Sequence, residues 1–141
     1  MIKNMCKFKK IYENFDLDND EKNDTNQINK AEEELKILFP KEYTEFLLEY
    51  HGGSGEIGEY YIDMWSLEDV IDFYDECTET GLEELVVFAS DGGGMGYAFD
   101  KKNNSIRIIP MDSLEYEYSK KCSDNFENFI QDMLDNKLIE Y

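Results

Sequence analysis

The stretch that decides the fold is residues 28–53, INKAEEELKILFPKEYTEFLLEYHGG, which has the pattern of two helices separated by a proline. Asn29 can cap the first helix, which is expected to end at about residue 38 because Pro40 cannot continue it. Pro40 instead suits the first position of the second helix, and Gly52 and Gly53 are expected to stop that helix. The apolar residues expected to face the core are Ile28, Ala31, Leu35 and Leu38 in the first helix, and Tyr43, Phe46, Leu47 and Tyr50 in the second.

The chain upstream of this stretch is mostly polar. Residues 5–15 carry apolar side chains at helical spacing, which predicts a short amphipathic helix. Residues 16–27 almost lack apolar side chains, so they are typical of a solvated linker. We therefore expect an N-terminal helix and polar linker over residues 1–27 and one domain over residues 28–141, within a single globular unit of 141 residues.

Downstream, the pattern changes to strands and then back to a helix. Residues 60–65 are β-prone, and Ser66 with Asp69 resembles a capping box before a third helix at about residues 67–77. Strand-like runs joined by short turns indicate an antiparallel meander at residues 85–89, 97–100 and 106–110. A weak strand or loop follows near Tyr116, and a last helix is expected at about residues 125–136, capped by Ser123 or Asp124. This order predicts the α+β class, with helices packed mainly on one face of an antiparallel sheet.

The negative charge of the chain is concentrated in its middle. No lysine or arginine occurs between Lys41 and Lys101, and these 59 residues hold 16 of the 33 acidic side chains that give a formal charge of −19. A field of one sign repels itself and weakens the compact state, so a positively charged partner would explain why it is kept. Nucleic acid and anionic membrane are disfavoured as partners for the same reason. The alternative is that the charge only confers solubility.

Cysteine usage and hydropathy are typical of a cytoplasmic protein. Cys6, Cys77 and Cys122 lie far apart and form no C-x-x-C motif, so reduced thiols are expected. The basic N-terminus is not followed by the apolar stretch of a signal peptide, and no run approaches the roughly 20 apolar residues of a membrane span. We therefore expect a cytoplasmic location.

A glycine-rich stretch, DGGGMG at residues 91–96, lies between the first two strands of the meander. Backbone N–H groups of glycine loops can hold phosphate, but here no Walker lysine follows, no helix begins, and Asp91 repels anions. We expect the glycines to permit positive φ in a wide hairpin turn, although such small residues would also let a partner's backbone approach closely. The glycines with this expected turn role are Gly92, Gly93, Gly94 and Gly96.

One group of aspartates has the spacing of a calcium-binding loop. Asp16, Asp18 and Asp20 occupy the first, third and fifth positions of such a loop. However, Glu21 stands where a glycine is needed, and Gln27 stands where a bidentate glutamate is needed. We therefore expect a solvated acidic segment there and no metal site.

His51 is the only histidine and could act as a base only with a nucleophile in reach. The pattern does not place it beside Ser90 or Asp91, so a cap or turn role is expected. One histidine and three scattered cysteines also do not supply four zinc ligands. We therefore expect no catalytic residue, no metal, no cofactor and no enzymatic activity.

The best candidate for a site is the acidic face of the third helix and the chain that follows it. No basic residue offers these acids the i,i+4 pairing that a solvated helix normally uses, although a solvated face is the plain alternative. An interface also needs an apolar or aromatic centre, for which Tyr60, Tyr61 and Trp65 are candidates. The acidic residues expected to bind a partner are Glu68, Asp72, Asp75, Glu76, Glu79, Glu83 and Glu84.

Three motifs, in order, resemble the SUKH superfamily. The first is residues 28–53, where an acidic amphipathic helix meets a proline, an aromatic follows three residues later, and a glycine pair ends the second helix. The second is residues 88–100, FASDGGGMGYAFD, and the third is Ile109 with Pro110 followed by Ser123, Phe126 and Phe129. The order and spacing agree over residues 28–134. The chain departs from the family in having His51 where Asn is common, and in its unusually polar N-terminal segment.

The resemblance implies a binding module without an active site. Members of the superfamily are chiefly bacterial immunity proteins that neutralise toxins, often nucleases, and a smaller branch acts as regulatory or scaffold proteins. Together with the acid-only middle of the chain, this predicts an immunity protein that docks an acidic surface on a basic toxin. The alternative is a regulatory or scaffold module of the Smi/Knr-like type, with no toxin partner. The oligomeric state is left open.

Overall fold

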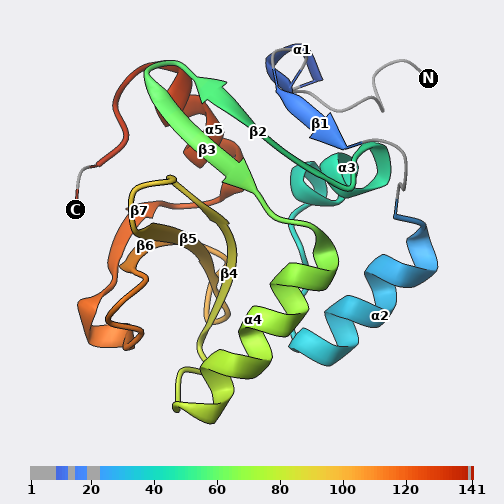
Figure 1. The fold of residues 1–141 in the computed structure, drawn as a ribbon, viewed down its shortest axis with the longest axis vertical. Coiled ribbons are helices and arrows are strands. Elements are labelled where there is room, and N and C mark those ends of the chain that lie inside the picture. Colours follow the sequence, from blue (N-terminus) through green and yellow to red (C-terminus); the bar gives the residue numbers. More distant parts are fainter. Residues whose placement is uncertain (1–8, 13–14, 19–22, 140) are drawn as a thin grey trace.

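A seven-stranded antiparallel sheet forms the centre of the computed structural model, which describes residues 9–12, 15–18, 23–139 and 141 (Figure 1). The strands lie side by side in chain order, and every neighbouring pair is antiparallel. The strands are β1 (Asp16–Asp18), β2 (Gly52–Ile57), β3 (Tyr60–Met64), β4 (Leu85–Ser90), β5 (Met95–Asp100), β6 (Ile106–Pro110) and β7 (Lys120–Ser123). The helices are α1 (Lys9–Tyr12), α2 (Thr25–Leu35), α3 (Lys41–Glu49), α4 (Leu67–Glu79), the 3-10 helix η2 (Tyr116–Tyr118) and α5 (Phe126–Leu134).

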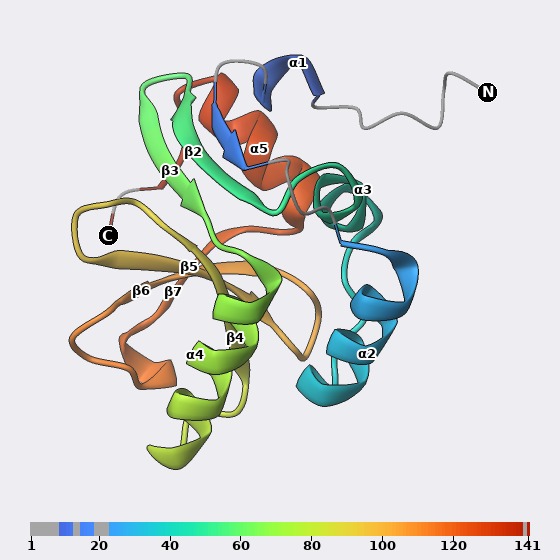
Figure 2. The same ribbon diagram turned by 45° about the vertical axis from the view of Figure 1, so that its right-hand side comes forward.

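The α+β class expected from the sequence is confirmed, and most helices pack on one face of the sheet. Helices α2, α3 and α5 lie on that face, as the turned view shows (Figure 2). Successive strand residues point to opposite faces, so Val86 and Phe88 join the main core while Leu85 and Val87 join a smaller cluster on the other face. Helix α4 contributes to both clusters, because it lies where β3 and β4 separate.

The main core is built around stacked aromatic rings. Phe88 of β4 stacks on Phe99 of β5 with ring centroids 4.3 Å apart and planes 20° apart. Three further rings, from Tyr43 of α3 and from Phe126 and Phe129 of α5, meet Phe88 edge-on at centroid distances of 5.5 to 6.0 Å. These contacts join both helices to the middle of the sheet.

The hydroxyl of Tyr43 is buried in this core without a hydrogen-bond partner. Burial accordingly raises the pKa of Tyr43 far above its usual range. We expect Tyr43→Phe to raise the free energy of unfolding by about 1 kcal/mol, because the variant removes an unpaired buried polar group. The matched control is Tyr74→Phe, since the Tyr74 hydroxyl donates to the Glu83 carbonyl at 3.2 Å and its loss should cost about 1 kcal/mol. Urea denaturation would measure both changes, and destabilisation by Tyr43→Phe would contradict the expectation.

The expectation of a solvated linker over residues 16–27 is wrong where the structure describes that stretch. Strand β1 pairs with β2, and helix α2 begins at Thr25 rather than after Asn29. Its cap is Asp24, whose carboxylate accepts from the Gln27 N–H at 2.8 Å while the Gln27 side chain accepts from the Asp24 N–H. The Asp-x-x-Gln pattern of this capping box could have been recognised in the sequence. The helix expected at residues 5–15 is described only at α1, and the rest of it, apart from Phe15, lies outside the described residues.

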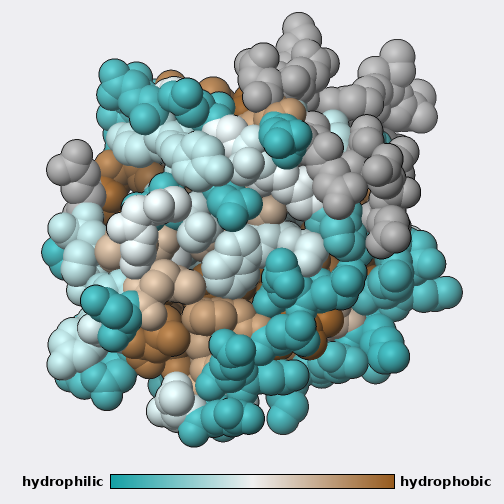
Figure 3. All heavy atoms as spheres, viewed as in Figure 1, coloured by the Kyte–Doolittle hydropathy of each residue, from teal (hydrophilic) through white to brown (hydrophobic). Residues whose placement is uncertain are grey.

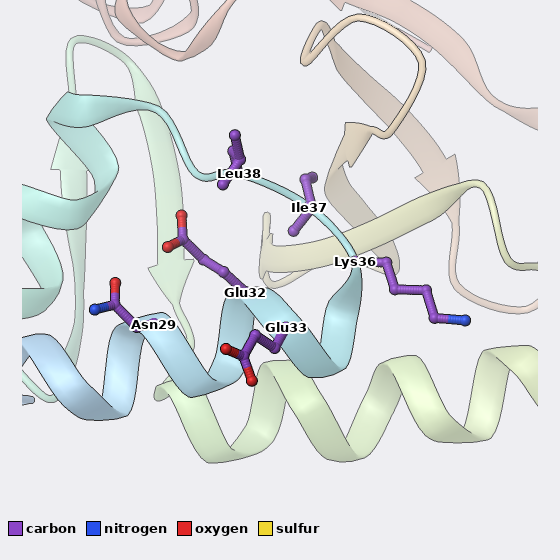
Figure 4. Close-up of a pocket in the computed structure, with 6 residues that line it drawn as sticks. All are labelled: Asn29, Glu32, Glu33, Lys36, Ile37 and Leu38. Carbon is purple, nitrogen blue, oxygen red and sulfur yellow. The ribbon is translucent and has the colours of Figure 1, made fainter.

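The end of α2 also differs from the sequence expectation. Lys36 adopts a left-handed conformation with φ of 57°, which ends the helix at Leu35 and leaves Leu38 77% exposed instead of buried. Figure 4 shows the chain leaving the helix at Lys36, with the Glu32 side chain pointing back toward it. The Glu32 carboxylate accepts a hydrogen bond from the Phe39 N–H at 2.8 Å, so this carboxylate fixes the path of the linker.

The end of α3 and the start of α5 are also determined by other residues than those expected from the sequence. Helix α3 ends at Glu49, and Gly52 and Gly53 do not stop it but begin strand β2, which the sequence pattern did not reveal. Helix α5 is capped by Asn125, whose side chain accepts from the Asn128 N–H at 2.7 Å, rather than by Ser123 or Asp124. The Ser66 cap of α4 is confirmed, since its hydroxyl accepts from the Asp69 N–H at 3.1 Å.

Candidate functional site

Helix α4 lies beside β4, where strands β3 and β4 pair over only two residues each and then separate. Asp63 and Met64 pair with Ser90 and Ala89, and the chain then turns away from the sheet into α4 (Figure 1). The helix buries one stripe of side chains, Leu67, Val70, Tyr74 and Cys77. The opposite side of the helix therefore faces solvent.

The acidic residues expected to form a site lie on that solvent-facing side or in the loop after it. The half-buried member of the set is Glu84, and the others are exposed. Among the described residues, the carboxylates of this set make one contact with a basic side chain: Glu68 Oε1 lies 3.8 Å from His51 Nε2, which forms an ion pair only when the imidazole is protonated. The exposed members are Glu68, Asp72, Asp75, Glu76, Glu79 and Glu83.

An open groove of about 450 Å³ lies between β3 and α4, and it is lined by two aromatic side chains, which we call its floor, and by four carboxylates, which we call its rim. The indole of Trp65 and the ring of Phe73 meet edge to face, with centroids 5.2 Å apart and planes 77° apart. The space-filling view shows brown, apolar surface between teal, hydrophilic side chains on the lower part of the face that carries α4 (Figure 3). The rim is formed by the carboxylates of Asp63, Asp69, Asp72 and Glu76.

Strand alternation explains how Asp63 and Trp65 reach the groove. Ile62 and Met64 are buried in the main core, so Tyr61, Asp63 and Trp65 point to the other face. Burial raises the pKa of Asp63, and the negative charge of Asp69 raises it further. Asp63, Asp69 and Phe73 are not among the site residues expected from the sequence.

The three aromatic residues proposed as anchors have different surroundings. Trp65 lies in the groove, and Tyr61 is 45% exposed on the same face of β3, beside the Gly92 backbone. Tyr60 packs against the core instead, and its hydroxyl accepts a hydrogen bond from the Leu138 N–H at 3.0 Å. Tyr60 therefore fastens the C-terminal segment and is not available on the acidic face.

Two backbone N–H groups of the glycine-rich loop are already hydrogen-bonded within the loop. The Asp91 carboxylate accepts from the Gly93 N–H at 2.7 Å and from the Met95 N–H at 3.0 Å, so these donors are not free for an anion. Gly92 and Gly94 have φ of 76° and 101°, which favours glycine. Gly93 has no such requirement, and Gly96 lies inside β5, where a Cβ would come within 2.6 Å of the Met111 sulfur.

The titratable groups considered for chemistry are dispersed. Burial raises the pKa of Cys77 to about 11 and that of Cys122 to about 12, so both are thiols at neutral pH. Cys6 lies outside the described residues, as does Asp20 of the calcium-like triplet, whereas Asp16 and Asp18 lie in β1. Within the described part of the chain, no group of three or more His, Cys, Asp or Glu side chains is arranged so that it could hold a metal ion.

Another hollow, of about 500 Å³, lies beside the linker between α2 and α3 (Figure 4). It is lined by Lys36 as well as by Glu32 and Glu33, and Glu32 is already bonded to the linker backbone. It therefore lacks the acid-only rim and the aromatic floor of the groove beside α4.

Comparison with known proteins places this fold in a family. Residues 22–132 match the SMI1 / KNR4 family (SUKH-1), and this match includes the groove, the glycine-rich loop and most of α5. No curated protein matches the chain. None of the helices in the described residues has the length and apolar character required to span a membrane. Since the match covers well over half of the chain, the protein belongs to the SMI1 / KNR4 (SUKH-1) family.

Proposed function

We propose that this protein is a cytoplasmic immunity protein that binds and neutralises a basic protein toxin of the nuclease type. The observation that carries the proposal is the exposed acidic side of α4, whose carboxylates find no lysine or arginine partner among the described residues. Family membership supports it, because the SUKH resemblance implies a binding module without an active site, and members of the superfamily are chiefly immunity proteins. The mechanism is occlusion, in which the acidic surface covers the basic nucleic-acid site of the toxin.

Electrostatics would act mainly on the rate of capture. A charged pair can associate at up to about 10⁸–10⁹ M⁻¹s⁻¹ at low salt, against about 10⁵–10⁶ M⁻¹s⁻¹ for uncharged pairs. Speed matters because a toxin damages the cell while it is free. The aromatic floor of the groove would supply the desolvated centre that affinity requires.

The partner is to be identified by pull-down with the tagged full chain against the product of the neighbouring gene. A toxin captured in this way, and inhibited by the protein, is the expected result. A captured regulatory protein that is not toxic would instead favour the scaffold alternative and contradict the immunity proposal.

Charge reversal on α4 tests whether the acidic surface recognises that partner. We expect the fourfold variant Asp72→Lys, Asp75→Lys, Glu76→Lys and Glu79→Lys to lower the association rate about tenfold or more at low salt, and to flatten its salt dependence. Stability should change little, since these side chains are exposed and each surface change is worth about ±0.5 kcal/mol. Stopped-flow binding at several salt concentrations would measure the effect.

The matched control reverses four exposed acidic residues elsewhere, Glu33, Glu59, Glu117 and Asp135, and changes the net charge by the same amount. Asp16 and Asp18 are unsuitable for this purpose, because they lie in β1 rather than in a linker. Equal losses from the two sets would mean that the total charge, and not the surface of α4, governs association.

A further inference from the structure

We propose that the groove between β3 and α4 binds an arginine side chain of the partner, with its guanidinium against Trp65 and Phe73 and among the four rim carboxylates. The inference rests on the proposed function in that the partner is a basic protein, and it names the side chain that the surface selects. Its basis is the combination of floor and rim, since neither alone would select a guanidinium.

The floor of the groove offers aromatic rings to a cation. Trp65 and Phe73 are only partly buried, and both line the open groove. An aromatic ring attracts a cation placed over its face, and tryptophan does so most strongly. An aromatic floor by itself would accept any apolar group, so the rim decides the occupant.

The rim supplies only negative charge. Within the described part of the chain, the carboxylates of Asp63, Asp69, Asp72 and Glu76 make no ion pair, and no lysine or arginine occurs in residues 42–100. Burial and the charge of Asp69 raise the pKa of Asp63, which shows that its charged form is poorly solvated there. A cation in the groove would offset this cost.

Some other aromatic rings of the protein already make cation–π contacts with its own lysine and arginine side chains. Lys101 lies 4.3 Å from the ring centroid of Tyr74, and Arg107 lies 4.6 Å from that of Tyr116. No such contact is found for Trp65 or Phe73 in the described residues. A cation placed over either of these two rings would therefore have to come from another molecule.

Arginine fits the groove better than lysine does. Its guanidinium is planar, so it can stack on a ring while its N–H groups point outward in the same plane. It can then donate paired hydrogen bonds to carboxylates on the rim, whereas a lysine ammonium offers a more strongly hydrated point charge.

Trp65 makes the test direct, because it is the only tryptophan and its indole N–H gives a single, identifiable NMR signal. The ¹⁵N-labelled full chain would be titrated with acetyl-Gly-Arg-Gly-amide, with the matched lysine peptide, and with the neutral citrulline peptide. We expect a saturable shift of the indole signal with arginine, at least fivefold weaker binding of lysine, and no saturable shift with citrulline. Equal binding of lysine, or any saturable citrulline response, would overturn the proposal.

Two variants of equal charge separate the groove from the total charge. The variant Asp69→Asn with Asp72→Asn should weaken arginine-peptide binding at least tenfold, while Glu33→Gln with Glu117→Gln should change it less than twofold. Similar losses from both variants would overturn the proposal.

The two proposals fail separately. If an identified toxin binds the Asp69→Asn, Asp72→Asn chain as tightly as the original, the groove assignment is wrong and the immunity function stands. If the arginine peptide shifts Trp65 but the captured partner is not a toxin, the groove stands and the immunity function is wrong.

Discussion

Replacing Phe88 by alanine is expected to lower the free energy of unfolding by about 4 kcal/mol, as for other large aromatic residues truncated in a core. Phe88 is fully buried, stacks on Phe99 and meets Tyr43, Phe126 and Phe129 edge-on. Truncation would leave a cavity between the sheet and two helices, and the ring-to-ring contacts would be lost together. Because single domains are stable by only about 5–15 kcal/mol, much of the stability would disappear.

The control for this truncation is Leu38→Ala. Leu38 is apolar too, but it is 77% exposed in the linker between α2 and α3, so the change should stay within about 0.5 kcal/mol. Urea denaturation of both variants measures the difference, provided that the slope with denaturant is unchanged. A loss below about 2 kcal/mol for Phe88→Ala would contradict the central position of this ring, given the usual cost of such truncations.

The sequence predicted the parts of the fold that depend on local pattern. The meander from β4 to β6 could be predicted because its strands are apolar runs separated by Gly or Asn turns. Strand β2 could not be predicted, because its sequence GGSGEI has little β propensity and the strand depends on tertiary pairing with β1 and β3. The exposed position of Leu38 likewise depends on the left-handed Lys36, which helical periodicity does not reveal.

The candidate site shows the same limit. The exposure of the α4 acids followed from helical spacing, because Val70 and Tyr74 fix the buried side. Asp63 was within reach of the sequence, since it alternates with Ile62 and Met64 in a β-prone run. The contact between Phe73 and Trp65 could not be predicted from the sequence. It requires α4 to pack where β3 and β4 separate, and no local sequence pattern specifies that packing.

A second large effect is expected where the tip of the β2–β3 hairpin meets the end of α5. Gly58 has φ of 59°, and a Cβ there would lie 2.1 Å from the Met133 carbonyl oxygen. The neighbouring Glu59 N–H donates to Asn136 Oδ1 at 2.9 Å, so the tip is fastened to this helix end and cannot move away without losing that bond. We expect Gly58→Ala to lower the free energy of unfolding by about 3 kcal/mol, from the strained conformation and the collision together.

Gly94→Ala separates these two causes. Gly94 has φ of 101°, but a Cβ there would meet no atom within 4 Å, so only the backbone conformation is strained. Gly94→Ala should lower the free energy of unfolding by about 1 kcal/mol, which is roughly 2 kcal/mol less than the effect of Gly58→Ala. Both values come from urea denaturation, and ¹⁵N spectra would show whether the Glu59 and Asn136 signals move in Gly58→Ala alone. Equal losses, with those signals unmoved, would mean that the hairpin tip is not packed on α5. The face of β3 that carries Tyr61 and Asp63 would then lack its anchor at the hairpin end of the strand.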